Sequence, residues 1–143
     1  MSSIGDIRDA LVTTLTAAVP SLAKVYRSVG SSVNVLPALV VTPAAPADFD
    51  VAMSRGTDTW LFDLIVLVSA ADLDVATDIL DGYIFGGGPD SIRQAIWNAR
   101  TLGLSDVDAH VSELTAYNIR YSVCDLDHMA ATLRLVVHTR GTQ

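Results

Sequence analysis

The chain has 143 residues, half of them hydrophobic, and it carries a formal net charge of −7 with a pI near 4.6. This length suits a single domain, which buries roughly 70% of the surface that the unfolded chain exposes. The acidic balance argues against a surface that grips nucleic acid, because neutralising phosphate groups requires clustered Lys and Arg. Abundant apolar residues with low charge favour association with other chains, so we expect an oligomer.

Three features bear on the compartment. The longest uncharged apolar stretch, Leu64 to Ala71, is far shorter than the ~20 residues that cross a bilayer, so we interpret it as a buried strand and expect no membrane partner. The N-terminus lacks the basic and apolar regions of a signal peptide. The single cysteine, Cys124, cannot form an intramolecular disulfide. We therefore expect the protein to stay inside the cell that makes it.

The first half of the chain predicts one helix followed by strands. Apolar residues at spacings of three and four predict an amphipathic helix at about residues 3–19. Short strands are expected at residues 24–27 and 36–41, after which two prolines break the chain. A hairpin at about residues 48–68 follows, and its apolar second arm should be central in the sheet and covered on both faces.

The second half predicts two helices and then two strands. Ser69 can cap a helix at about residues 70–85, and a glycine-rich break separates it from a second helix at about residues 89–101. A strand is expected from Val107 to Leu114, and the last strand, from Ala131 to His138, follows a polar turn at residues 125–128. The whole pattern predicts a single α+β domain of residues 1–143, with a mixed, mostly antiparallel sheet and a long hairpin. The N-terminal helix and the central helix pair are expected to pack on the sheet.

No motif for catalysis or for binding a metal or cofactor is found in the sequence. The glycines at Gly86–Gly88 precede a helix, but the segment lacks the lysine of a phosphate-binding loop. His110 and Glu113 should point to opposite faces of a strand, so they are not expected to chelate a metal together. His128 and His138 lack cysteines at zinc spacing, and we assign them to a turn and to a strand surface. We predict no enzymatic activity, no cofactor and no metal.

Asp63 is unusual because it interrupts an apolar strand. An unpaired buried carboxylate would cost several kcal/mol or shift its pKa. Three interpretations are open: an ion pair with Arg120 or Arg134 of a neighbouring strand, exposure at an edge, or an acid with a functional role.

The order of these blocks resembles the tail terminator proteins of siphophages, whose tails are long and non-contractile. The segments that carry the resemblance are Val25-Tyr26-Arg27-Ser28-Val29, Leu36-Pro37-Ala38-Leu39-Val40-Val41, Arg55-Gly56-Thr57-Asp58-Thr59-Trp60, and the strand end Val68-Ser69-Ala70-Ala71-Asp72. Leu80-Asp81-Gly82-Tyr83, Ser91-Ile92 and a closing strand pair around Tyr117 to Tyr121 extend it over nearly the whole chain.

The resemblance implies a homohexameric ring in the neck of the virion, made in the host cytoplasm. Such a ring caps the finished tail tube, ends polymerisation of the major tail tube protein, and joins the tail to the head-tail connector or stopper protein. Genomic DNA passes through the lumen without specific binding. An acidic chain suits that passage because it repels phosphate.

We place tail-tube docking on the hairpin, where Met53, Arg55 and Trp60 offer side chains that are enriched at interfaces. Arg55 has an alternative role as a solubilising turn residue. Six aspartates either line the lumen or solubilise the outside: Asp48, Asp50, Asp58, Asp72, Asp74 and Asp78.

Two other classes of function stay open. One is a different neck protein, such as a head-tail joining or tail completion factor. The other is an enzymatic or small-ligand-binding α+β domain that uses Asp63 with His110 or His138. A pocket that held Asp63 and one of these histidines within hydrogen-bond reach would favour that second class.

Overall fold

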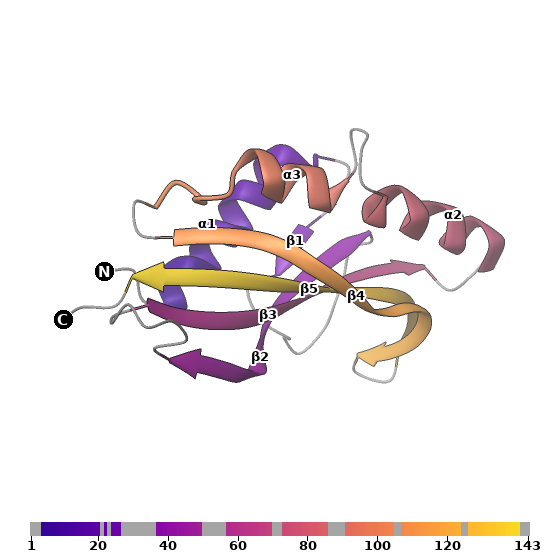
Figure 1. The fold of residues 1–143 in the computed structure, drawn as a ribbon. Helices are drawn as coiled ribbons and strands as arrows, with labels where there is room; N and C mark the ends of the chain where they lie inside the picture. The colour runs from indigo at the N-terminus through magenta and orange to yellow at the C-terminus, as the bar shows by residue number, and fades with distance from the viewer. Residues whose placement is uncertain are drawn as a thin grey trace.

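The computed structural model describes residues 4–20, 22, 24–26, 37–49, 57–69, 73–85, 91–104, 107–123 and 126–140. Within these ranges the chain forms three helices and one five-stranded sheet (Figure 1). The elements in chain order are α1 (Ile4–Ala18), β1 (Lys24–Tyr26), β2 (Ala38–Phe49), β3 (Thr57–Ser69), α2 (Leu73–Ile84), α3 (Ile92–Asn98), β4 (Val107–Val123) and β5 (Leu126–Arg140). The predicted α+β class, with its mixed sheet and long hairpin, is confirmed.

The sheet has the strand order β1-β2-β3-β5-β4. The short strand β1 runs parallel to β2, and all other pairs are antiparallel. β3 lies in the centre, and its side chains are buried without a break from Leu64 to Val68. The expectation that this strand is central and covered on both faces is therefore confirmed.

The helices cover one face of the sheet and create the main core (Figure 1). Alternate residues of β3, such as Phe62 and Leu64, belong to the same buried cluster as Ile7 and Leu11 of α1 and Ile96 of α3. A smaller cluster consists of the intervening residues, which point to the other face: Ala38, Val40, Ile65, Leu67 and Ala130. The two-residue period of the strands separates the two clusters.

The hairpin is longer than predicted. β2 and β3 pair antiparallel from Ala38 opposite Leu67 to Phe49 opposite Asp58, so the expected break at the two prolines is wrong. β1 pairs with β2 only as far as Val40, which leaves the outer edge of β2 unpaired with β1 beyond that point. Proline is tolerated at such an edge, and the register shift between Ala44 and Asp48 takes up the irregularity.

The last two strands also extend past their predicted ends. β4 and β5 form one long hairpin, in which the expected strand from Val107 to Leu114 continues to Val123. Three register shifts between Val111 and Ile119 interrupt the alternation that would have revealed it. The polar turn predicted at residues 125–128 is wrong in part, because β5 already begins at Leu126.

The helix boundaries differ from the expectation at the two central helices. Ser69 is the last residue of β3, opposite His128, and therefore does not cap α2. Ser91 caps α3 instead: its Oγ accepts a hydrogen bond from the Gln94 amide at 3.1 Å and donates one to the Phe85 carbonyl. α3 ends at Asn98, before the predicted residue 101. The Arg100 carbonyl accepts a bond of 2.7 Å from the Ala109 amide of β4, so it serves the sheet rather than the helix.

Leu64→Ala should strongly destabilise the protein, because Leu64 is fully buried between the central strand and the helices. We expect the free energy of unfolding to fall by about 2–5 kcal/mol in urea denaturation. Leu114→Ala is the matched control: Leu114 is 43% exposed, and its loss should cost about 1 kcal/mol or less. Equal losses in the two variants would contradict this description of the core.

Candidate functional site

The four predicted lumen residues that the structure describes lie near opposite ends of β3. Asp48 and Asp58 belong to the backbone ladder at the far end of the β2–β3 hairpin. Asp74 and Asp78 are exposed on α2, which follows the opposite end of β3. Since β3 has 13 residues, about 40 Å of extended chain separates the two pairs. Four of the predicted residues fall outside the described part of the chain: Asp50, Met53, Arg55 and Asp72.

Trp60 is half-buried in β3 and packs against the main core. Its ring therefore supports the hairpin from within, and only part of its surface is open to a partner. A contact with a tail tube at this position would use a side chain that also holds the sheet together.

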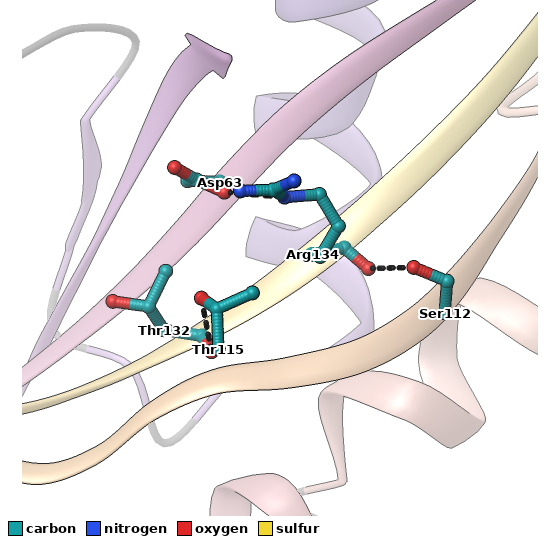
Figure 2. A network of polar contacts seen from close by, with 5 residues as sticks. All are labelled: Asp63, Ser112, Thr115, Thr132 and Arg134. Carbon is teal, nitrogen blue, oxygen red and sulfur yellow. Dashed lines mark hydrogen bonds and ion pairs between the residues drawn. The ribbon is translucent and has the colours of Figure 1, made fainter. Parts of the chain in front are cut away.

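Asp63 forms an ion pair across the sheet with Arg134 (Figure 2). The two residues are directly opposite on β3 and β5, and Arg134 Nε donates to Asp63 Oδ1 at 3.0 Å. Each side chain is about one quarter exposed, at 25% for Asp63 and 24% for Arg134. Of the interpretations left open by the sequence, the cross-strand pair with Arg134 is the one that the structure contains.

Two hydroxyl groups of β4 support the same region (Figure 2). Ser112 Oγ donates to the Arg134 carbonyl and Thr115 Oγ1 to the Thr132 carbonyl, each at 3.3 Å. Both residues lie in the stretch where register shifts interrupt the β4–β5 ladder. These two hydroxyl groups therefore add side-chain hydrogen bonds between β4 and β5 where the backbone ladder is irregular.

The histidines of the sheet do not meet Asp63. The Nδ1 of His138 lies 3.0 Å from Thr59 Oγ1, and the ring of His138 stacks on that of His110 with centroids 6.0 Å apart. Thr59 and Asp63 are four residues apart on β3, which corresponds to about 13 Å. The arrangement that would have favoured an enzymatic or ligand-binding function, Asp63 within hydrogen-bond reach of a histidine, is not formed.

His110 and Glu113 lie on the same face of the sheet, contrary to the prediction. His110 is opposite Val136, and Glu113 is opposite Arg134, which precedes Val136 by two residues in β5 and therefore lies on the same face. The register shift between Val111 and Glu113 inserts one residue into β4, which reverses the expected alternation. Among the described residues, no group of three or more His, Cys, Asp or Glu side chains could hold a metal ion.

His128 is also placed differently from the prediction. It belongs to β5 rather than to a turn, and it is only 5% exposed. Its Nε2 has no hydrogen-bond partner among the described residues. His138 is a half-buried strand residue, close to the expected strand-surface role.

A groove between α3 and β4 was not predicted. One hollow of about 270 Å³ is lined by Ile84, Arg93, Val111–Leu114 and Leu133, and a second of about 370 Å³ by Arg93, Gln94, Trp97, His110 and Val111. The two hollows share Arg93 and Val111 and are therefore adjacent, and we call them together the α3–β4 groove. Its polar and aromatic wall could have been inferred from the sequence: Arg93 and Trp97 are four residues apart, off the apolar stripe of the helix.

The second exposed surface is the outer face of α2. Asp74, Val75, Asp78 and Ile79 are all exposed, and Val75 and Ile79 have 52% and 39% of their surface accessible. The C-terminal half of α2 is tied to β4, since the Tyr117 hydroxyl donates to the Asp81 carboxylate. That hydrogen bond and the negative charge of Asp81 raise the pKa of Tyr117 above its usual value.

No protein-family model and no curated protein matches this chain significantly. Within the described ranges, none of the helices is long and apolar enough to span a membrane. The interpretation of function therefore depends on the sequence resemblance and on the surfaces described above.

Replacing Arg134 by Met should leave the Asp63 carboxylate without its partner at a position that is three-quarters buried. We expect Arg134→Met to lower the free energy of unfolding by about 1–3 kcal/mol. The double variant Asp63→Leu/Arg134→Met should recover most of that loss, because an apolar pair suits the neighbouring residues of the sheet. A double-mutant cycle in urea measures the coupling, and a double variant less stable than either single variant would contradict the assignment.

Proposed function

We propose that this protein is a siphophage tail terminator, which forms a homohexameric ring on the end of the tail tube. The resemblance of the ordered sequence blocks suggests this class of protein. The observation that carries the proposal is the presence of two unlike exposed surfaces on one subunit, the outer face of α2 and the α3–β4 groove. A closed ring requires heterologous contacts between two such surfaces.

The proposed ring has two neighbours along the tail. One is the major tail tube protein, whose polymerisation the ring ends, and the other is the head-tail connector or stopper protein. The residues Phe49 and Asp58 of the β2–β3 hairpin lie at the end of β3 opposite to the end that α2 follows, so tube docking and the contacts of α2 can use separate surfaces. We assign tube docking to that hairpin, including Met53, Arg55 and Trp60.

The net charge of −7 supports the passage of DNA through the ring. A lumen that repels phosphate lets the genome slide during ejection, whereas clustered cations would hold it by counterion release. The hairpin pair Asp48 and Asp58 and the helix pair Asp74 and Asp78 cannot be neighbours within one subunit. Only one of these two pairs is expected to face the lumen at the level of the tube.

A different neck protein is the alternative within the same particle. A head-tail joining or tail completion factor could use the same two surfaces, since the fold does not determine the partner. The two possibilities differ in the structure to which the protein attaches: the open end of the tail tube or the head.

Purified protein should assemble into six-subunit rings on tail tubes. We expect light scattering to show an increase in mass when the protein is mixed with its own tail tubes, and electron microscopy to show six-fold rings at one end of each tube. Binding to isolated heads but not to tubes would favour another neck protein. A monomer or dimer that binds neither would contradict the proposal.

The double variant Arg55→Ala/Trp60→Ala should reduce tube capping, because it removes a guanidinium group and an aromatic ring from the docking hairpin. Since Trp60 also packs against the core, the matched control is Arg55→Ala/Trp60→Phe, which keeps an aromatic ring against the core. Circular dichroism checks that each variant is folded. Tail tubes capped equally well by the folded double-alanine variant would remove the hairpin from the docking surface.

A further inference from the structure

The outer face of α2 combines acidic and apolar side chains. Asp78, Val75 and Ile79 lie at spacings of three and four residues, so they share one side of the helix, and all three are exposed. Exposed aliphatic residues on a helix that also carries carboxylates form a surface suited to a partner that is both apolar and positively charged.

Gly82 lies on the same side of α2, four residues after Asp78. A Cβ atom at this position would meet no atom of the described chain within 4 Å, so no contact with the described residues requires a glycine. Glycine in the interior of an exposed helix is unfavourable compared with alanine. Close approach of another chain to the helix gives a physical reason for the missing side chain.

The α3–β4 groove presents side chains that can pair with those on the outer face of α2. Its wall presents Arg93, which is exposed, and Trp97, which is 60% exposed. The Arg100 guanidinium lies 4.7 Å from the centre of the Trp97 ring, and its charge is paired with Asp108, whose carboxylate accepts bonds of 3.0 and 3.1 Å from Arg100. Val111 and Leu114 supply the apolar floor. The groove therefore offers the exposed cation of Arg93 together with aromatic and aliphatic groups, and its lining also includes the carboxylate of Glu113.

We propose that the outer face of α2 of one copy docks into the α3–β4 groove of the next copy of this chain. Asp78 then meets Arg93, while Val75 and Ile79 cover Trp97 and the apolar floor, and Gly82 allows the helix to approach closely. The contact joins two different surfaces, which is the kind of contact that a closed ring of identical subunits requires. The inference deepens the proposed function and rests on it, because it identifies the subunit contact of the ring.

An added strand is a less suitable occupant of the groove. β4 is the edge strand of the sheet, but three register shifts interrupt it between Val111 and Ile119. Irregularities of this kind protect an edge from pairing with another strand. A helix needs no regular row of backbone donors and acceptors from its partner, so an irregular edge does not hinder it.

Charge reversal tests the pairing of Asp78 with Arg93. We expect Asp78→Arg and Arg93→Asp each to weaken self-association by about tenfold or more, and the double variant Asp78→Arg/Arg93→Asp to restore it. Asp9→Arg, an exposed charge reversal on α1, is the matched control and should associate like the wild type. Analytical ultracentrifugation, alone and with tail tubes, measures the assembled fraction.

A variant at Gly82 distinguishes a contact between two copies of the chain from a structural role of this glycine within one subunit. Gly82→Leu should raise the thermal midpoint of the subunit, because it replaces glycine in a helix where a side chain has open space. The same variant should lose assembly, because leucine fills the space that the partner occupies. A Gly82→Leu variant that is more stable and still assembles would overturn the proposal.

Cross-linking tests the contact directly. Cys124→Ser removes the one native thiol, after which Ile79→Cys and Trp97→Cys are introduced into separate chains. Oxidation of the mixture should give a disulfide-linked dimer of the two different chains, and Val12→Cys in place of Ile79→Cys should not. Wild-type rings without this cross-link would overturn the docking and leave the terminator function standing. A wild-type chain that stays monomeric both alone and on tail tubes would overturn both.

Discussion

The burial of the central strand β3 fixes the arrangement of the other strands and of the helices. β3 pairs with β2 on one side and with β5 on the other, and its five residues from Leu64 to Val68 have almost no contact with solvent. A strand buried in this way must satisfy its backbone groups through both neighbours, so β2 and β5 are held in register along most of its length. The helices can then cover only the face that carries Phe62 and Leu64.

The register of β3 with β5 also explains why polar side chains in the sheet have partners on the neighbouring strand. Asp63 is tolerated in β3 because the register places Arg134 directly opposite it, and His138 finds Thr59 in the same way. These polar pairs occupy positions beyond the fully buried segment, where the side chains keep some contact with water. They hold the register of the sheet, and the exposed surfaces described above belong to other elements.

Those surfaces are the outer face of α2 and the α3–β4 groove. The helices that form them bury only one face in the core. Leu80 of α2 and Ile96 of α3 are fully buried, while Ile79 and Trp97, their immediate neighbours in sequence, are exposed. The helices thus carry apolar residues on two faces, and the sheet can cover only one of them. The second apolar face is the physical basis for expecting a partner. Because α2 exposes Asp78 and α3 exposes Arg93, another copy of the chain is a suitable partner.

Local patterns in the sequence predict the three helices, the α+β class and the central place of β3, because each depends on a local apolar period or on a single buried run. The sequence also offered two arginines as partners of Asp63, beside exposure at an edge and a functional role. The features that depend on register appear only in the folded sheet: the choice of Arg134, the shared face of His110 and Glu113, and the burial of His128. One inserted residue in β4 reverses the alternation that the sequence suggests, and the need for it arises only when the strand bends against β5. The α3–β4 groove likewise exists only after two segments from different parts of the chain are packed together.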